Sequence, residues 1–142
     1  MRKYIALVLA LVCVLVLVSC DQKKQQDLSF LNYENLVSVA SQSDTLSVSK
    51  SEEENDYIIG GTQLAQFLDT ANWTAQTGFT RKVQRDTEEN SKSSIQINFV
   101  GVYLKIFDTD TANIYDESIG KDRYYRMSDG DYEKILDMVT PA

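Results

Sequence analysis

The chain has 142 residues, with 14 basic and 21 acidic side chains, two cysteines and no histidine. That length suits one domain of ordinary size, and the lack of histidine excludes Ser-His-Asp and Cys-His catalysis as well as histidine-bound metals. A formal net charge of −7 makes a nucleic-acid partner unexpected, because the phosphate backbone repels an acidic surface. We therefore expect a binding domain without a cofactor rather than an enzyme.

The N-terminal segment has the pattern of an export signal. Two cationic residues, Arg2 and Lys3, precede an unbroken apolar run over residues 4–18. The run is shorter than the roughly 20 residues that span a bilayer as a helix, and it fits the apolar region of a signal peptide. The chain becomes polar directly afterwards, at residues 21–27.

The end of this run, Leu17-Val18-Ser19-Cys20, resembles the lipobox of bacterial prolipoproteins. The resemblance implies that the Cys20 thiol receives a diacylglyceryl group with palmitate-type acyl chains, and that signal peptidase II cuts after Ser19. Two acyl chains hold a protein stably on a membrane, so the chain would be exported and its domain would lie outside the cytoplasm. An ordinary cleaved signal or an uncleaved anchor is the alternative. The chain as a whole resembles small uncharacterised cell-envelope lipoproteins.

Processing at this box would divide the chain into a signal peptide over residues 1–19, the lipidated Cys20 with a tether over 20–34, and a single domain over 35–142. The tether begins with Gln, Lys and Asp residues, which have little apolar surface to bury. The formal charge would change from −7 to −9, because two cationic side chains leave with the signal peptide. The mature chain would also contain no free thiol.

The first half of the domain shows two β-branched runs, at residues 36–40 and 45–48, on either side of a polar turn. This pattern favours a hairpin, although residues 28–40 also fit a helix. An acidic loop follows over residues 49–56.

A short apolar run at residues 57–59 ends at a Gly pair, and Thr62 then stands in N-cap position. Apolar residues recur from there at three- and four-residue spacing until Trp73, which predicts a helix. We expect Trp73 to fill the core at the end of that helix.

The second half alternates between apolar and polar residues, which predicts strands. The expected strands lie at residues 79–84, 95–99, 102–107, 112–116 and 123–127. A charged turn is expected over residues 85–90. Ser128 and Asp131 have capping-box spacing, in which the Ser hydroxyl accepts the N–H of Asp131 and Asp131 reaches back. The apolar face that follows predicts a last helix, ending before Pro141.

These elements predict the α+β class, with an antiparallel β meander and two helices packed on one face as a two-layer sandwich. No internal repeat or low-complexity tract interrupts the pattern.

One acidic turn has a metal-like spacing. Oxygen-bearing side chains recur at Asp108, Asp110, Asn113 and Asp116, as at the start of a calcium loop, so a small-ligand or calcium site from Asp108 to Glu117 is one alternative. The closing glutamate of such a loop is missing, since Ile119 stands in its place. Short polar side chains also cap ordinary turns, and we favour that interpretation, so no metal is expected.

Paired carboxylates leave a carboxylate-dependent hydrolase as a second alternative. The candidates are Glu52–Glu54, Glu88-Glu89, Asp116-Glu117 and Asp129/Asp131. Each lies in a predicted turn or cap, where acids are usually solvated. No apolar stretch surrounds any of them to raise its pKa for proton donation, so this alternative is the weaker one.

Aromatic residues give the main candidate for a binding surface. Five of the eight tyrosines fall between residues 103 and 132, interleaved with basic side chains. Tyrosine and arginine are favoured in binding hot spots. The predicted binding residues are Tyr103, Lys105, Tyr115, Tyr124, Tyr125 and Arg126.

Strand alternation adds one restriction, because one of Tyr124 and Tyr125 must point inward. Tyrosine is also a good strand former, so the cluster has a purely structural alternative. The sequence thus predicts a lipid-anchored extracytoplasmic binding domain, with an envelope protein as the expected partner besides the membrane itself.

Overall fold

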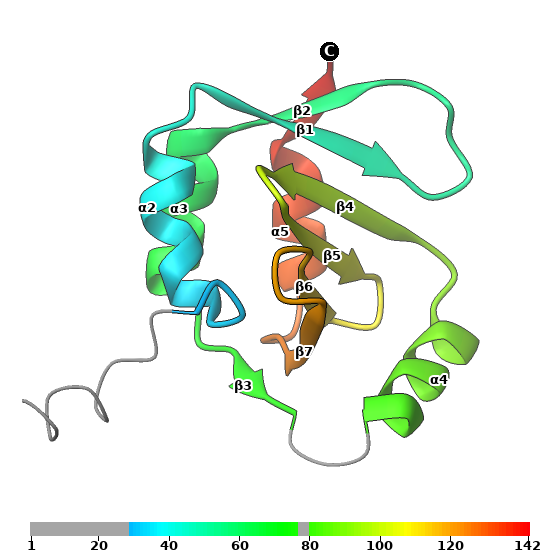
Figure 1. The fold of residues 1–142 in the computed structure, drawn as a ribbon. Helices are drawn as coiled ribbons and strands as arrows, with labels where there is room; N and C mark the ends of the chain where they lie inside the picture. Colours follow the sequence, from blue (N-terminus) through cyan, green and yellow to red (C-terminus); the bar gives the residue numbers. More distant parts are fainter. Residues whose placement is uncertain (1–28, 77–79) are drawn as a thin grey trace, which may run out of the picture.

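The structure is a computed structural model that describes residues 29–76 and 80–142. Within these residues the strands form one eight-stranded antiparallel sheet in the order β3-β7-β6-β5-β4-β1-β2-β8 (Figure 1). The strands are β1 (Thr45–Lys50), β2 (Tyr57–Gly60), β3 (Thr74–Ala75), β4 (Ser94–Phe99), β5 (Val102–Phe107), β6 (Thr111–Asp116), β7 (Lys121–Arg126) and β8 (Val139–Pro141).

A short 3₁₀ turn and four helices accompany the sheet in the described residues. They are η1 (Tyr33–Asn35), α2 (Leu36–Ser41), α3 (Gly61–Thr70), α4 (Thr80–Asn90) and α5 (Asp131–Met138). None of the helices in residues 29–76 and 80–142 is long and apolar enough to cross a membrane. The apolar run at residues 4–18 and Cys20 lie outside the described residues.

The meander β4-β5-β6-β7 follows the predicted alternation. In β4, Ile95, Ile97 and Phe99 are buried and the intervening residues are half-buried. Neighbouring strands pair in register, for example Ile97 with Leu104 and Leu104 with Ile114, so apolar residues gather on one face, called here the inner face.

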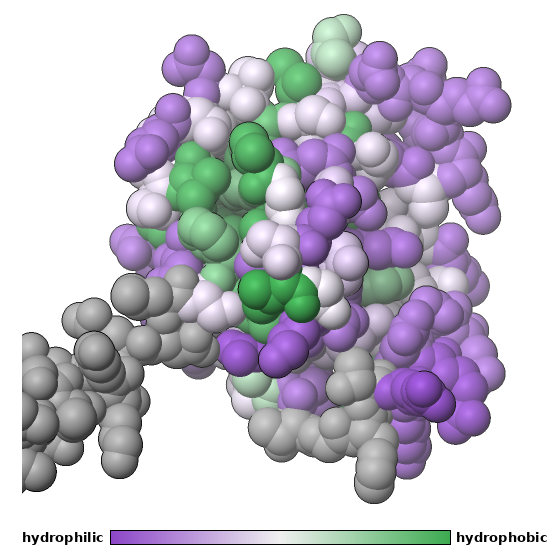
Figure 2. Space-filling view, in the orientation of Figure 1, coloured by the Kyte–Doolittle hydropathy of each residue, from purple (hydrophilic) through white to green (hydrophobic). Residues whose placement is uncertain are grey.

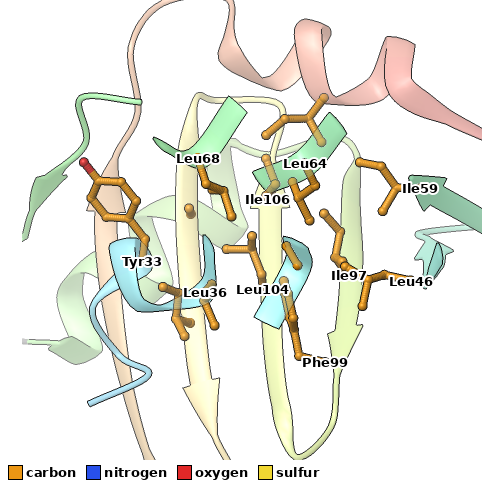
Figure 3. Close-up of a cluster of buried hydrophobic side chains, with 14 of the residues drawn as sticks. Tyr33, Leu36, Leu46, Ile59, Leu64, Leu68, Ile97, Phe99, Leu104 and Ile106 are labelled. Atoms are coloured by element: carbon orange, nitrogen blue, oxygen red, sulfur yellow. The ribbon is translucent and has the colours of Figure 1, made fainter. Parts of the chain in front are cut away.

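The core lies between this inner face and three helices. Leu36 of α2, Leu64 and Leu68 of α3 and Ile135 of α5 are fully buried in the same cluster as the inward residues of the strands (Figure 3). The α+β class, with an antiparallel sheet and helices packed against it, is therefore confirmed.

The opposite surface of the sheet, called here the outer face, carries α4. Phe107 and Tyr124 are buried but do not belong to the core cluster. They alternate with inward residues of β5 and β7, so their side chains point to the outer face. Thr87 of α4 is buried as well, and Val83 and Thr87 face β6 and β7 across a shared groove. One part of the outer face is therefore covered and the rest is open.

The predicted strand at residues 36–40 is wrong, because these residues form helix α2. Leu36 and Ala40 lie four residues apart and are both fully buried, which is the spacing of one helix face. The alternation of β-branched residues there did not decide the structure, because packing against α3 overrides a weak local strand preference.

The predicted strand at residues 79–84 and the charged turn at 85–90 are also wrong, because α4 begins at Thr80 and continues to Asn90; residue 79 lies outside the described residues. Val83 is half-buried and Thr87 is buried, one helical turn apart, while most of the charged residues are exposed. A charged segment with one narrow apolar stripe has the sequence pattern of a turn. This segment is helical because the stripe packs against the sheet.

The folded part begins before residue 35. Leu31 and Tyr33 are each 6% exposed and belong to the core cluster, and Tyr33 donates a hydrogen bond to the carbonyl of Ala71 at 2.9 Å. Residues 29–34 therefore belong to the domain and not to the tether, which corrects the boundary at residue 34.

Both predicted helices are present with altered ends. The helix expected from Thr62 to Trp73 covers Gly61–Thr70, and its N-cap is Gly60, without a side-chain hydrogen bond. Trp73 is 6% exposed in the core cluster, as predicted.

At the start of α5, half of the predicted capping box is present. The carboxylate of Asp131 accepts the N–H of Ser128 at 3.3 Å. The Asp131 N–H donates to the Ser128 carbonyl, and not to the hydroxyl that was expected to accept it.

Candidate functional site

Two tyrosines and a lysine predicted as binding residues lie together on the open part of the outer face. Tyr103 pairs directly with Tyr115 across β5 and β6, and their rings are stacked with centroids 6.3 Å apart. Lys105 lies two residues along β5 and so points to the same side. Tyr115 is 38% exposed and the other two are half-exposed, so all three are accessible from solvent.

Polar side chains from neighbouring strands extend this surface. Gln96 donates to Asn98 along β4 at 3.0 Å, and Asn98 donates to Ser47 of β1 at 3.1 Å. On the other side, Asn113 of β6 donates to Asp122 of β7 at 3.0 Å. We call this surface the tyrosine platform and define it by Ser47, Gln96, Asn98, Tyr103, Lys105, Asn113 and Tyr115.

The hydroxyl of Tyr103 is held in its neutral form. It donates to a carboxylate oxygen of Glu117 at 3.3 Å. The negative charge of Glu117 raises the pKa of Tyr103, and desolvation and this hydrogen bond add to the effect. The platform therefore presents aromatic rings with their hydroxyls, amide groups and one ammonium group, the last lying 5.2 Å from the centroid of the Phe107 ring.

Tyr125 is the inward member of the predicted Tyr124-Tyr125 pair. Its ring packs edge-on against Tyr33, and its hydroxyl donates to the carbonyl of Leu31 at 2.6 Å. Tyr125 is 3% exposed and belongs to the core, so its assignment to the binding face is wrong.

Tyr124 lies on the outer face but is buried beside α4. Burial raises its pKa to about 12, with smaller contributions from the negative charges of Asp122 and Glu88. With 6% of its surface exposed it cannot serve as an open contact residue while α4 is in place.

Arg126 is exposed on the outer face but borders a different feature from the platform. It lines a polar groove of about 320 Å³ between α4 and the ends of β6 and β7. The other residues along the groove are Gln76, Val83, Asp86, Thr87, Asn90, Thr109 and Thr111. The predicted binding residues are thus divided among the platform, the part of the outer face covered by α4, the groove and the core.

The acidic side chains of the metal-like turn cap backbone groups. Asp108 accepts the N–H groups of Lys92 and Ser93 at 3.1–3.2 Å. Asp110 accepts the N–H groups of Gly130 and Tyr132 at 3.1 and 3.0 Å, which ties the turn to the start of α5.

The other two weak metal candidates lie away from these carboxylates. Asn113 belongs to the platform, and Asp116 accepts the N–H and the hydroxyl of Ser118 in its own turn, at 3.0 and 2.6 Å. Within residues 29–76 and 80–142, no group of three acidic, His or Cys side chains could hold a metal ion.

The carboxylate pairs considered for hydrolysis lie in separate elements. Glu52–Glu54 are exposed in the β1–β2 loop, Glu88-Glu89 are exposed on α4, and Asp116-Glu117 lie where β6 ends and the β6–β7 turn begins. Asp129 is exposed before α5.

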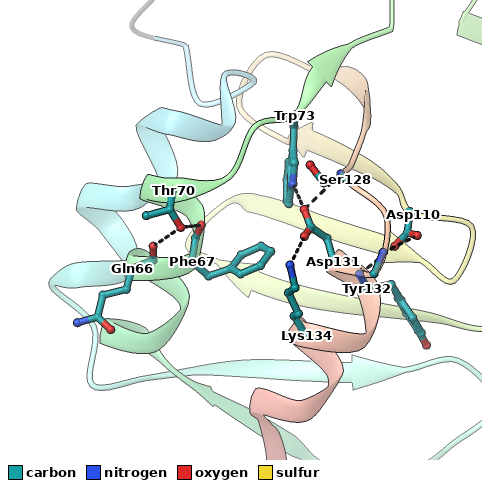
Figure 4. Close-up of polar contacts among 10 residues, drawn as sticks. Gln66, Phe67, Thr70, Trp73, Asp110, Ser128, Asp131, Tyr132 and Lys134 are labelled. Carbon is teal, nitrogen blue, oxygen red and sulfur yellow. Dashed lines mark hydrogen bonds and ion pairs between the residues drawn. The ribbon is translucent and has the colours of Figure 1, made fainter.

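Asp131 is buried and holds the fold together (Figure 4). Its carboxylate accepts the indole N–H of Trp73 at 3.0 Å and pairs with the ammonium of Lys134 at 3.4 Å. This carboxylate therefore has a structural role in joining α5 to the segment after α3.

The amide residues of the platform were missed from the sequence. Gln96 and Asn98 alternate with buried Ile95 and Ile97, so their side chains had to point outward. That alternation was visible, but it does not tell which outward residues lie beside Tyr103, because the pairing of β4 with β5 is set by the fold.

Comparison of the chain with protein-family models, with curated proteins and with solved structures gives no match. The geometry of the chain's own residues is therefore the basis for assigning a function.

Proposed function

We propose that this chain is a lipid-anchored extracytoplasmic binding domain and that its tyrosine platform contacts a protein of the cell envelope. The observation that carries the proposal is the stacked pair Tyr103 and Tyr115, which is accessible from solvent beside Lys105 on the part of the sheet that α4 leaves open. Stacked aromatic rings offer a large contact area at small entropic cost, because each ring has only two side-chain torsions to immobilise.

The composition of the platform favours a protein partner. Amide groups on both sides of the rings can donate and accept hydrogen bonds, as in the chain between Gln96, Asn98 and Ser47. Aromatic centres with polar rims are typical of protein interfaces. The histidine-free composition and the separate placement of the carboxylate pairs favour binding over catalysis.

The membrane attachment is tested at Cys20. We expect fatty-acid labelling of the wild-type chain, a mature N-terminus at residue 20, and loss of both in Cys20→Ala. Labelling that persists in Cys20→Ala, or a detergent-extracted protein that retains residues 1–19, would contradict the anchor.

The platform is tested by photo-crosslinking in intact envelopes, using wild type and a Tyr103→Ala/Tyr115→Ala variant. Tyr57→Ala is the matched control, because Tyr57 is a half-exposed tyrosine whose hydroxyl bonds to Glu53 in the β1–β2 loop, away from the platform. We expect one defined protein to crosslink to wild type and to the control at similar yield, and to be lost from the double variant. Equal recovery of that protein by all three folded chains would disprove the platform.

A further inference from the structure

Two exposed apolar side chains lie at the same end of the sheet. Val100, in the β4–β5 turn, is fully exposed, and Ile119, in the β6–β7 turn, is 51% exposed. The turns are neighbours, because the N–H of Glu117 donates to the carbonyl of Gly101 at 3.0 Å. We call this end, defined by the turns 100–101 and 117–120, the apolar end.

The described chain begins toward this apolar end. Figure 3 shows the first described residues, before α2, on the side of the sheet's end where Phe99 and the β4–β5 turn lie. Phe30, at this beginning, is 40% exposed, and Val37 and Val39 on α2 are only partly buried. In Figure 2 hydrophobic residues gather over α2 and the adjoining turns.

Acidic residues are concentrated at the opposite end. The register of Lys50 with Ile95 and of Ser47 with Asn98 places the β1–β2 loop at the end of the sheet away from Val100. That loop carries four exposed acidic side chains, Glu52, Glu53, Glu54 and Asp56. This loop, with its four acidic side chains, is therefore held away from the apolar end, where Glu117 is the exposed acidic side chain of the two turns.

We propose that the apolar end rests on the lipid bilayer, with Val100 and Ile119 inserted at the boundary between head groups and acyl chains. This inference rests on the proposed lipid anchor, which would leave only residues 21–28 between the acylated Cys20 and the described domain. Eight extended residues reach at most roughly 28 Å, so the anchor keeps the apolar end at high effective concentration beside the membrane. Weak insertion of two side chains then suffices to orient the domain.

The orientation has a consequence for binding. With the apolar end on the membrane, the strands rise from the bilayer and the acidic loop and α4 point away from it. The tyrosine platform then stands on the side of the domain and faces along the membrane, toward partners that are themselves held in the membrane.

The test places an environment-sensitive fluorophore on Val100→Cys, and on Glu54→Cys as the distal control, in the full chain processed by a lipoprotein-exporting host. Each protein is reconstituted into phosphatidylcholine vesicles that contain nitroxide-labelled lipid. Insertion to a depth of roughly 5–10 Å brings the probe at position 100 among the labelled lipids. We expect quenching at position 100 to be at least about twice that at position 54. Adding Ile119→Asp should reduce the quenching at position 100, and adding the distal change Ser49→Asp should not.

Equal quenching at the two positions, or no effect of Ile119→Asp, would overturn the docking. The emission at position 100 is also measured without vesicles. An increase with protein concentration would show that the apolar end contacts a second copy of the chain, and this too would overturn the membrane docking. The mass of Cys20 reports separately on the anchor. If Cys20 carries no lipid, the same two probes are read in a chain held to nickel-chelating lipid by a polyhistidine tag in place of residues 1–20, so the docking is decided either way.

Discussion

The buried carboxylate of Asp131 joins three parts of the chain. It accepts the indole N–H of Trp73 and the backbone N–H of Ser128, and it pairs with Lys134 (Figure 4). Charge-assisted hydrogen bonds in a buried site are stronger than neutral ones, and removal of one partner leaves the others without an acceptor.

We therefore expect Asp131→Ala to lower the free energy of unfolding by about 2–3 kcal/mol. The measurement is urea denaturation followed by the fluorescence of Trp73. Asp129→Ala, two residues earlier and exposed, should change stability by less than about 0.5 kcal/mol. Equal losses in the two variants would show that the indole contact contributes nothing.

Tyr124 gives the fold a dependence on alkaline pH. Burial, then the charges of Asp122 and Glu88, raise its pKa from 10.0 to about 12. Below pH 10 the hydroxyl is neutral in both states. Between pH 10 and 12 the unfolded chain ionises while the folded chain does not, so the free energy of unfolding falls with rising pH.

The size of this effect is up to about 2 kcal/mol for a shift of this kind. The test compares urea midpoints of wild type and Tyr124→Phe at pH values on both sides of this window. We expect the decline to be shallower in Tyr124→Phe, because the variant lacks the hydroxyl that ionises in this window. Some decline should remain, since Tyr57 and Tyr103, whose pKa values are also raised, are present in both proteins. Identical slopes would contradict the assignment.

At the scale of elements, Gly61 decides how closely α2 and α3 approach. A Cβ atom at position 61 would lie 1.9 Å from the carbonyl oxygen of Ser43 and 2.4 Å from that of Ala40. Both oxygens belong to the backbone and cannot rotate away. The Gly61 N–H also donates to the carbonyl of Asp44 at 3.0 Å.

Gly61→Ala should therefore lower the free energy of unfolding by roughly 3 kcal/mol or more, because it forces the two helices apart. Gly60→Ala is the matched control, since its Cβ would meet only the flexible side chain of Gln63 at 3.1 Å. We expect a change of less than about 1 kcal/mol there. Chemical denaturation of both variants, with circular dichroism to check the fold, measures the difference.

The same scale explains which elements could be predicted. Strands β4, β5 and β6 were predictable because each alternates clearly, as Ile95, Ile97 and Phe99 do in β4. Helix α4 was not, because its buried side is one narrow stripe that includes Val83 and Thr87. A stripe of that width forms a stable helix only against another surface.

At the scale of the whole molecule, the two ends of the sheet differ in chemistry. Val100 and Ile119 expose apolar surface at one end, and the acidic β1–β2 loop and the charged helix α4 lie at the other. The outer face between them is divided into a part covered by α4 and the open tyrosine platform. This difference between the two ends is consistent with the proposed orientation, in which the apolar end contacts the membrane and the tyrosine platform faces sideways.

The sequence by itself determined the local properties of this protein. The absence of histidine, the apolar run before Cys20 and the alternation over residues 94–126 are properties of neighbouring residues, and periodicity alone reveals which side of a strand is buried. The tertiary structure decided which surfaces stay open. Tyr124 is buried because α4 covers it, and Tyr115 is exposed because α4 does not. Which surface is covered depends on contacts between residues far apart in the chain, and the free energy of those contacts cannot be inferred from a local sequence pattern.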